Sequence, residues 1–468
     1  MEKFRVDFNK EVPKYIKIEK HLKELVEKEK IMDGEKLPSI RTLSSFLKVN
    51  KDTIINAYNK LEEDGYAVQK MGSGTYVKKN QSTLIRFKKE YSNTIKKLNY
   101  NSNKQYIDFV GESTLSNNFP INNFKKVLNE VLDRDGASAF IYKEVLGYDG
   151  LRESISKFFW NGRYGLDDIL IVSGAQQGID VISKAIINNR DNVIVEKPTY
   201  NGALSVFNWR RANILEVPLE SDGIDLNKFE KTLQKNKIKC FYTMSYFQNP
   251  SGITYSLEKK KRILQLADMY DFYIIEDDYL SELIYTDEIQ YKSFKSLDKN
   301  ERVIYIKSFS KIFLPGIRLG YLIPPKRLKE SIINFKINTD IATSSLMQRA
   351  LELYVTKGYW KNHIENFRES YKITYDFLTN ILKNDFKEEL TFIPSGGGLS
   401  LYVKLNNKMD SLELFYKCRE RNVIITPGVF FYKDFKEGLS YFKLGFSNLK
   451  QDGMIKGTQV LKDILKRG

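Results

Sequence analysis

The chain has 468 residues, of which 42% are hydrophobic and 29% charged, which fits a globular, multidomain protein with a substantial core. Its formal net charge of +16 suggests an acidic partner such as DNA, although a lysine-rich composition alone does not establish one. Two cysteines exclude a disulfide scaffold, and no apolar stretch has the length of a membrane span or the character of a signal peptide, so we expect a cytoplasmic protein.

The first part of the chain has the pattern of a winged helix-turn-helix. Residues 13–28 carry apolar side chains at helical spacing. Ser39 is placed to cap a second short helix, and Asn50 is placed to cap a third that runs to residue 64. A hairpin with its turn at 71–74 follows. Two helices joined by a tight turn and followed by a two-stranded wing predict a DNA-binding domain.

This predicted domain spans residues 1–78 and has polar side chains where such domains meet DNA. Because the second helix of the motif enters the major groove, Arg41, Lys51 and Thr53 are the candidates for contact with bases or nearby phosphates. The residues expected to hold the DNA backbone are Ser39, Lys70, Ser73 and Thr75. The alternative reading of the same pattern is a helical module that docks another protein.

The segment KLPSIRTLSSFLKVNKDTIINAYNKLEEDGY, followed by GSGTYV, resembles the GntR family of bacterial regulators. The resemblance covers about 65 residues and implies binding to double-stranded DNA. One position departs from the family, which often has arginine where this chain has Lys51. Lysine lacks the planar fork of arginine, so a bidentate contact with guanine is not expected there.

Residues 79–104 are predicted to form a basic linker between domains. They contain no glycine or proline and show only weak periodicity. Residues 81–104 carry six Lys or Arg against one acidic residue. This charge would allow the linker to follow DNA or an acidic surface of a partner domain, and a solvated tether is an equal alternative.

From residue 105 onward, strand-like and helix-like blocks alternate, which predicts an α/β domain. Four apolar strands end in polar or aromatic residues, and such strand ends are where open α/β sheets bind ligands. The four predicted loops are Ser173 to Gly178, Glu196 to Tyr200, Gln248 to Gly252, and Glu276 to Tyr279. The first of them has glycine ahead of a helix start, which directs backbone N–H groups at an anion.

A fifth strand, residues 303–306, leads into SFSKIFLPGIRLGY, the stretch with the strongest chemical signal. Lys311 offers an amine that can form a Schiff base, and Arg318 offers a planar fork for a phosphate. Ser308 and Ser310 add hydroxyl groups. An amine beside a phosphate site is what pyridoxal phosphate (PLP) requires. A basic loop after a strand is the alternative.

These five loops, in this order, resemble the fold-type I PLP enzymes of the aspartate aminotransferase superfamily. The resemblance implies a PLP-binding, transferase-like domain over residues 105–468, with a smaller C-terminal α+β subdomain at about 340–468. It implies that Lys311 forms the Schiff base, Asp277 faces the pyridine nitrogen, and Tyr200 stacks on the ring.

The same resemblance implies the remaining cofactor contacts. Tyr279 and Asn249 would bond the ring oxygen, and the phosphate would be held by Ala175, Gln176, Ser308 and Arg318. Tyr142 would reach the phosphate of a neighbouring subunit, since dimers of this superfamily share their sites, although it could also be a core tyrosine. The choice of Asp277 over the adjacent Asp278 depends on the register of the resemblance alone.

One position departs from the aminotransferases. They bind the substrate α-carboxylate with an arginine in a C-terminal segment, and the corresponding segment here, 441–447, has Lys443 in its place. Lysine can pair with a carboxylate but orients it less firmly, so Lys443 is the candidate effector-binding residue and ordinary transamination is in doubt.

A GntR-type domain joined to an aminotransferase-like domain resembles the MocR subfamily of regulators. The resemblance implies a transcriptional regulator, working as a head-to-tail homodimer, that senses PLP itself or an amine or amino-acid effector at Lys311. The alternative is an active aminotransferase whose DNA-binding domain regulates its own gene. The sequence does not decide between these functions or identify the effector.

Overall fold

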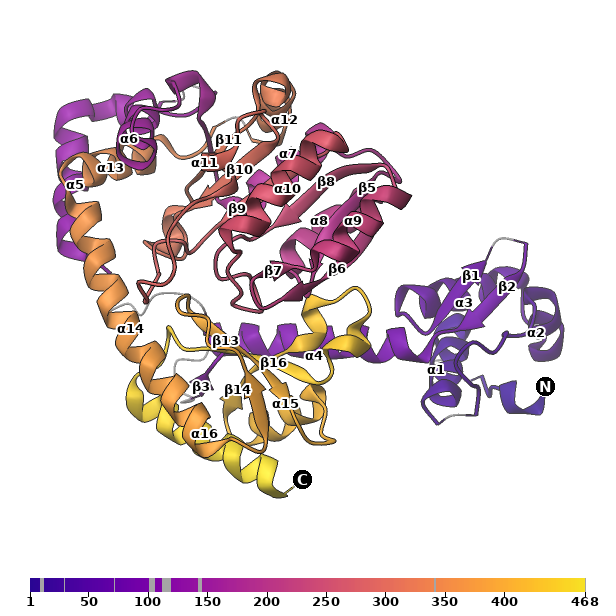
Figure 1. Cartoon of the computed structure of the whole chain (residues 1–468). Helices are drawn as coiled ribbons and strands as arrows, with labels where there is room; N and C mark the ends of the chain where they lie inside the picture. The colour runs from indigo at the N-terminus through magenta and orange to yellow at the C-terminus, as the bar shows by residue number, and fades with distance from the viewer. Residues whose placement is uncertain are drawn as a thin grey trace. The chain divides into compact units, whose positions relative to one another are not determined.

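The computed structural model describes residues 1–8, 12–28, 30–70, 72–100, 106–111, 119–141, 145–340 and 342–467. The chain divides into two compact units, residues 1–105 and 106–468 (Figure 1). Of the helices in the described ranges, none combines the length and the apolar character needed to cross a membrane.

The first unit is the predicted winged helix-turn-helix. Its elements are the 3-10 turn Glu2–Phe4, α1 (Lys14–Glu27), α2 (Ile40–Leu47), α3 (Lys51–Glu63), β1 (Ala67–Lys70), β2 (Gly74–Val77) and α4 (Lys79–Tyr100). The apolar faces of α1 and α3 meet in the core, where Ile18, Ile54 and Tyr58 are buried. Strands β1 and β2 pair antiparallel from Ala67 opposite Val77 to Lys70 opposite Gly74, which is the predicted hairpin.

The segment predicted as a linker is helical for most of its length. Helix α4 contains 22 residues, and Phe87 within it is buried. Arg86 pairs with Glu90 one turn later and lies 3.5 Å from Glu27 of α1. The stretch is therefore a helix with one buried aromatic residue and an ion pair at i,i+4 spacing, which its weak apolar periodicity did not indicate.

The second unit is built on an eight-stranded sheet. In spatial order the strands are β4 (Leu170–Val172), β11 (Gly320–Ile323), β10 (Val303–Ser308), β9 (Tyr273–Asp278), β8 (Ile238–Thr243), β5 (Asn192–Lys197), β6 (Asn213–Glu220) and β7 (Gly223–Ile224). The strands from β10 to β6 are parallel, whereas β11 and β7 run antiparallel to their neighbours. The near-continuous apolar runs of these strands fit a sheet covered on both faces.

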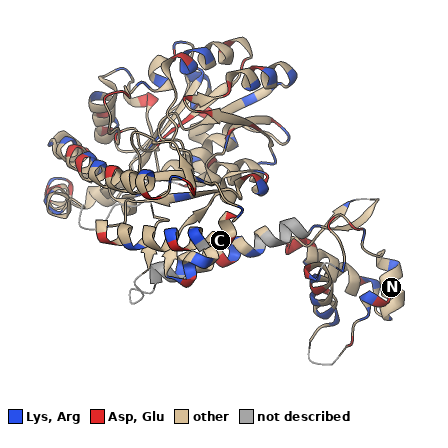
Figure 2. Ribbon diagram, turned by 60° about the horizontal axis from the view of Figure 1, so that its bottom comes forward, with Lys and Arg blue, Asp and Glu red and all other residues tan. Residues whose placement is uncertain are grey.

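Helices surround this sheet (Figure 1). They are α5 (Ile121–Asp135), α6 (Asp149–Trp160), α7 (Ala175–Ile186), α8 (Asn201–Trp209), α9 (Leu226–Lys235), α10 (Leu257–Met269), α11 (Phe294–Leu297), α12 (Lys329–Thr339) and α13 (Ser345–Thr356), and the long α14 (Tyr359–Asp385) leads from α13 away from the sheet. Short 3-10 turns lie at Gly136–Phe140, Leu166–Asp168, Pro315–Ile317, Lys326–Leu328, Gly428–Phe431 and Phe435–Gly438. The ribbon coloured by charge shows Lys, Arg, Asp and Glu positions along many of the helices and loops (Figure 2).

A smaller α+β subdomain follows α14. Its sheet is antiparallel, in the order β12 (Leu390–Phe392), β13 (Ser400–Leu405), β16 (Tyr441–Gly445) and β15 (Thr426–Pro427), with helices α15 (Ser411–Glu420) and α16 (Gln451–Arg467). Strand β14 (Val423–Ile424) pairs with β3 (Ile107–Asp108) from the start of the unit. The small subdomain was expected to begin at about residue 340, so β3 was not included in it. A strand of two residues is too short to be recognised from its sequence.

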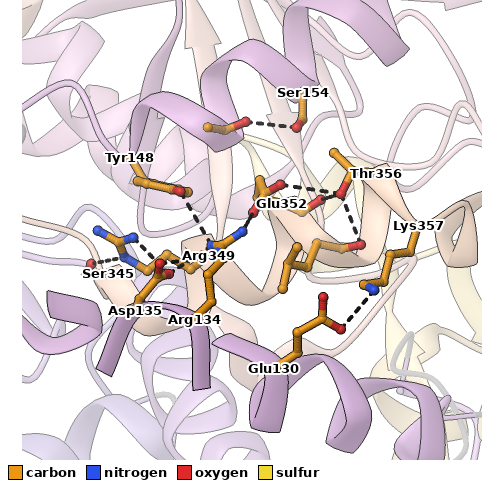
Figure 3. Close-up of polar contacts among 12 residues, drawn as sticks. Glu130, Arg134, Asp135, Tyr148, Ser154, Ser345, Arg349, Glu352, Thr356 and Lys357 are labelled. Atoms are coloured by element: carbon orange, nitrogen blue, oxygen red, sulfur yellow. Dashed lines mark hydrogen bonds and ion pairs between the residues drawn. The ribbon is translucent and has the colours of Figure 1, made fainter. Parts of the chain in front are cut away.

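Ion pairs join α5 to α13 within the second unit (Figure 3). The Asp135 carboxylate accepts from Arg134 at 2.8 Å and from Arg349 at 3.0 Å, and the Arg134 guanidinium lowers the pKa of Asp135 below its usual range. Arg134 also pairs with Glu352 at 3.0 Å. Arg134 and Asp135 in the last turn of α5 thus hold this helix against α13 through their pairs with Glu352 and Arg349.

Candidate cofactor site and DNA-binding surface

The strand register brings the predicted site loops to one edge of the large sheet. Ile306 of β10 lies opposite Asp277 of β9, so the carboxyl ends of these parallel strands are level. Ser308 lies opposite Gly320, and Gly320 lies opposite Val172 at the end of β4. The loops after β4, β9 and β10 and the start of β11 therefore meet at the edge where α/β sheets bind ligands.

Asp277 has one carboxylate oxygen that is left for a ligand. Its Oδ2 accepts a hydrogen bond from the Tyr242 hydroxyl at 2.7 Å. Its Oδ1 is buried and has no hydrogen-bond partner among the described residues. Burial raises the pKa of Asp277 to about 7, against the opposing effect of the Tyr242 hydrogen bond. A buried acceptor of this kind fits a protonated ring nitrogen, which would favour the ionised carboxylate.

The Asp278 side chain lies on the opposite face of the sheet from Asp277, because adjacent residues of a strand point to opposite faces. Its carboxylate accepts from the Lys307 ammonium at 2.9 Å and from the Tyr305 hydroxyl at 2.8 Å. Burial alone would raise the pKa of Asp278, but Lys307 outweighs it and the pKa lies below its ordinary value. Of the two adjacent carboxylates, Asp277 is therefore the one that is free to receive the ring.

The start of α7 and Arg318 form an anion-binding cradle. Gly174 precedes α7 with φ of +94°, and a Cβ there would lie 2.8 Å from the Arg318 Nη2. The guanidinium donates to the Ser173 carbonyl at 3.0 Å and to the Ser310 hydroxyl at 3.2 Å. Ala175 and Gln176 begin the helix, so their backbone N–H groups face this place. This geometry suits a phosphate.

Ser308 and Lys311 lie in the turn between β10 and β11. Ser308 is buried, and its hydroxyl accepts from the Ser310 backbone N–H at 3.3 Å. Lys311 is half-buried. The Phe309 N–H donates to the Leu319 carbonyl at 3.1 Å, which ties the two sides of the turn together. The sheet thus holds Lys311 close to the serines and Arg318.

Tyr200 and Gln176 belong to the same edge. The Tyr200 hydroxyl donates to the Gln176 Oε1 at 3.2 Å, and the Gln176 amide donates to the Gly202 carbonyl at 3.2 Å. Tyr200 is the N-cap residue of α8, following β5. Its ring is therefore anchored next to the start of α7.

Asn249 and Tyr279 are buried beside the turn after β8. The Asn249 Oδ1 accepts from the Lys443 ammonium at 3.3 Å, and Lys443 comes from β16 of the small subdomain. The Lys443 ammonium also lies 5.4 Å from the centre of the Phe431 ring. The Tyr279 hydroxyl donates to the Phe247 carbonyl at 2.7 Å, so its predicted bond to a ring oxygen requires that donor to change partner.

Two residues have roles in the site that were not predicted from the sequence. One is Tyr242, which orients Asp277. The other is Glu196, buried in β5, whose carboxylate accepts from Thr243, Tyr255 and Gln248 at 2.5, 2.8 and 3.0 Å. Burial raises the pKa of Glu196 to about 7. An acidic residue inside an apolar strand was the available signal for this network, which fixes the turn that carries Asn249.

Tyr142, predicted to reach a neighbouring subunit, lies outside the described residues.

In the first unit, most of the predicted DNA contacts are exposed. Arg41, Lys51, Lys70 and Ser73 are exposed, and Thr53 is half-buried in the first turn of α3. Ser39 is exposed and caps α2, its hydroxyl accepting from the Thr42 N–H at 3.1 Å, as predicted. Asn50 is the N-cap of α3 but makes no side-chain capping bond.

Thr75 does not fit the predicted role. It is 6% exposed, and its backbone carbonyl accepts from Leu37 at 2.8 Å. In strand β2 the side chains alternate between faces, so Thr75 and Val77 point into the core while Ser73 in the turn is exposed. The side chain of Thr75 is therefore not available to a DNA phosphate.

A winged helix-turn-helix followed by a fold-type I PLP domain defines a class of DNA-binding regulators with an aminotransferase-like ligand domain. Residues 110–454 match the family model for aminotransferase class I and II, and residues 14–77 match that for bacterial regulatory proteins of the gntR family. The chain belongs to the aminotransferase class I and II family and, with its GntR domain, to the MocR subfamily of GntR transcriptional regulators.

Relatives of both kinds are similar to this chain. The uncharacterized HTH-type transcriptional regulator YdfD of Bacillus subtilis is 28% identical over 98% of this chain and 97% of its own length. Aromatic-amino-acid aminotransferase 1 of Thermococcus litoralis is 30% identical over 77% of this chain and 88% of its own. The kynurenine aminotransferase of Pyrococcus horikoshii has a solved structure with a TM-score of 0.75 and 30% identity, covering 80% of this chain and 94% of that one.

PLP is the cofactor of the second unit. LysN, the α-aminoadipate aminotransferase of Thermus thermophilus, was solved with N-(5'-phosphopyridoxyl)-L-leucine and aligns with a TM-score of 0.74 and 25% identity over 80% of this chain and 94% of its own. The residues of this chain fit the cofactor: the orphaned Asp277 Oδ1, the cradle of Arg318 and α7, and the amine of Lys311 in the adjoining turn.

Proposed function

We propose that this protein is a cytoplasmic transcriptional regulator that senses an amine or amino-acid effector, or PLP itself, at Lys311. The observation that carries the proposal is the contrast between the groups suited to the ring nitrogen and phosphate of PLP and the lysine at position 443. Asp277, Arg318 and the start of α7 suit the cofactor, but the position expected to bind an α-carboxylate holds a buried lysine whose ammonium already contacts Asn249 at 3.3 Å.

When bound, PLP supplies an aldehyde carbon that condenses with amines and a ring that withdraws electrons. The residues of this chain would hold and orient it. The Asp277 Oδ1 would accept a hydrogen bond from the protonated ring nitrogen, and the Tyr242 hydroxyl fixes the carboxylate through Oδ2. Arg318, Ser308 and the first N–H groups of α7 would hold the phosphate.

Two contacts support coupling between ligand and conformation. Lys311 lies in a turn clamped between β10 and β11, so whether Lys311 is tethered to the cofactor affects that turn. Lys443 joins the small subdomain to the Asn249 turn of the large part. A ligand carboxylate that draws Lys443 away from Asn249 would shift the small subdomain, and such a shift is a signal that a two-state regulator can use.

A working aminotransferase is the second candidate. The retained cofactor-binding set favours it, as does the 30% identity with the aminotransferase of Thermococcus litoralis. Lys443 counts against it, because a lysine holds a carboxylate through one point charge rather than a planar fork.

We further propose that two chains form a head-to-tail dimer that binds an operator with two half-sites. The superfamily likeness and the exposed apolar side chains of Phe140 and Ile141, at 64% and 50% exposure, support this dimer. Sedimentation of the PLP-loaded protein at micromolar concentration tests it, and a monomer under those conditions would contradict it.

The regulatory proposal is tested by DNA binding. Fluorescence anisotropy would follow a labelled duplex from upstream of the protein's own gene, with and without PLP and with a panel of amines. We expect at least one condition to change the Kd of the wild type about tenfold, the usual scale of coupling between sites. Lys311→Ala should retain DNA binding and lose this response, and an unchanged response would overturn the proposal.

A further inference from the structure

A cavity of about 460 Å³ lies in the second unit, away from the Lys311 turn. Its walls come from the turn after β6, the segment 251–257 after β8, Lys260 of α10, the loop 288–292, and residues 393–395 of the small subdomain. A Cβ on Gly252 would lie 2.8 Å from the Ser395 Cβ, so the two parts of the unit come into close contact at the cavity.

The cavity shares a wall with the turn that carries Asn249. The Gly252 N–H donates to the Gln248 carbonyl at 2.6 Å, and the Ser251 hydroxyl donates to the Gln248 Oε1 at 2.6 Å. Ser251 and Gly252 line the cavity, while Asn249, two residues earlier, contacts Lys443. A molecule in the cavity would therefore contact the turn that borders the cofactor site.

Lys260 places a buried cation in this wall. It is 1% exposed, its ammonium donates to the Lys292 carbonyl at 3.0 Å, and it lies 3.8 Å from the centre of the Tyr246 ring. No ion pair joins Lys260 to a carboxylate within the described ranges. Burial lowers the pKa of Lys260 to about 8. A buried ammonium with a single carbonyl acceptor gains most from an added anion.

The other charged groups of the wall leave room for that anion. Asp222 is paired with Lys259 at 2.7 Å. Glu288 and Lys292 are exposed and opposite in charge. The hydroxyls of Tyr246 and Tyr255 donate to the Gln290 carbonyl and to Glu196. Lys260 is thus the buried charge of the cavity that forms no ion pair among the described residues, and the buried carboxylates of Glu276 and Asp278 attract its ammonium only from a longer distance.

The rest of the wall is apolar. Ile253, Leu257, Ile289, Ile393 and Pro394 line it, and Ile393 is 55% exposed at its edge. A few convergent polar groups within apolar walls of this volume are the usual character of a small-molecule site.

We propose that this cavity binds a small apolar carboxylate, with its carboxylate on Lys260 and its hydrocarbon or aromatic part against the isoleucines. Occupancy stabilises the contact between the segment 251–257 and the loop 393–395. The site is separate from the PLP site and goes beyond the function proposed above.

The test uses the PLP-loaded full chain and acids that carry neither an amino nor a keto group. Calorimetry would measure binding of benzoate, isovalerate and indole-3-acetate, with benzamide and isovaleramide as neutral counterparts. We expect at least one acid to bind and its amide to bind about tenfold more weakly, because a hydrogen bond to a charged group is lost.

Lys260→Met keeps an unbranched side chain that is one heavy atom shorter, removes a buried charge, and should weaken acid binding about tenfold. Lys295→Met is the matched control, because Lys295 is also buried, donates to one carbonyl at 2.8 Å, has a pKa lowered to about 8, and does not line the cavity. Ile393→Trp, at the edge, is a second variant that should block the cavity if Lys260→Met does not fold.

The outcomes are distinct. Failure of every acid to bind, equal binding of acids and amides, or equal losses in Lys260→Met and Lys295→Met would overturn the proposal. Binding lost in Lys443→Met but kept in Lys260→Met would also overturn it, by placing the acid in the cofactor site. The visible absorption of bound PLP should be unchanged in Lys260→Met, so failure here leaves the proposed regulatory function standing.

Discussion

Asp277 shows how one buried side chain couples the cofactor to pH. In an unfolded chain a carboxyl titrates near pH 4, whereas burial raises the pKa of Asp277 to about 7. Between these values the folded, cofactor-free protein keeps a proton that the unfolded chain has lost. Its contribution to the free energy of unfolding therefore falls as pH rises from about 4 to 7 and stays level above that.

Asp277→Asn removes this dependence. Without cofactor, the wild type should lose stability between pH 5 and pH 8 through Asp277, and the variant should not. The free energy of unfolding of the variant minus that of the wild type should therefore increase over this range by an amount on the order of a few kcal/mol. Urea titrations of both proteins at the two pH values measure it. At pH 8 the variant should bind PLP about tenfold more weakly, since the charged partner of the ring is gone. A relative stability that decreases with pH would contradict the assignment.

Lys443 separates two classes of effector. Lys443→Met should abolish the response to amino acids, which carry a carboxylate, and leave the response to simple amines and the binding of PLP intact. The visible absorption of bound PLP, titrated with an amino acid and with its decarboxylated amine, measures both. Equal loss of both responses would mean that Lys443 acts through Asn249 on the ring and does not bind a carboxylate.

Substitution can separate the observed role of Ser39 as a helix cap from its predicted role in binding DNA. Ser39 caps α2 through a hydrogen bond from Thr42, and it is exposed where DNA phosphates are expected. Ser39→Ala should lower the free energy of unfolding by about 1 kcal/mol. Ser39→Asp should keep the cap and repel phosphate, so thermal stability should hold while operator affinity falls. If Ser39→Asp leaves the operator affinity unchanged, Ser39 does not lie against the DNA.

At the scale of elements, the N-terminal ends of α2 and α3 and the wing are predicted to carry the DNA contacts. Arg41→Ala and Lys51→Ala should each weaken operator binding by about 1–3 kcal/mol, and loss of a phosphate contact should reduce the salt dependence by about one counterion. Thr75→Val in the buried face of the wing and Lys28→Ala, an exposed lysine paired with Glu24, are the controls. Anisotropy titrations at several salt concentrations measure all four.

The elements of the site could be predicted because apolar runs end in polar residues. Two of the loops were expected to begin at Glu276 and Glu196, but in the structure the strands before them extend to Asp278 and Lys197, because buried acidic side chains remain within the sheet ladder. Glu196 and Tyr242 were not predicted, since their roles come from cross-strand hydrogen bonds that no local spacing encodes. The sequence could not show which of Asp277 and Asp278 faces the cofactor. The structure does, because Lys307 binds the Asp278 carboxylate on the opposite face of the strand.

Longer-range features were beyond the sequence pattern. Strand β3 has two residues and pairs with β14 more than 300 positions later. The contact of Lys443 with Asn249 likewise joins distant segments. Helix α4 was not indicated because its sequence lacks a clear apolar stripe, and Phe87 is the large apolar side chain that it buries.

For the whole molecule, the central claim is that the PLP domain senses a ligand for the DNA-binding domain and does not turn it over. The claim depends on residues that suit PLP combined with Lys443 at the position where we expect the aminotransferases to have a carboxylate-binding arginine. A sensor should respond to its ligand once and then stop, whereas an enzyme should complete a half-reaction and reverse it with a keto acid.

The direct measurement is the visible absorption spectrum of the PLP-loaded protein, titrated with a panel of amines and amino acids and then with keto acids. We predict that one ligand shifts the cofactor band to a stable new position and that keto acids have no effect on it. A spectrum that runs on to the amine form of the cofactor and is restored by a keto acid would contradict the account and identify a working aminotransferase.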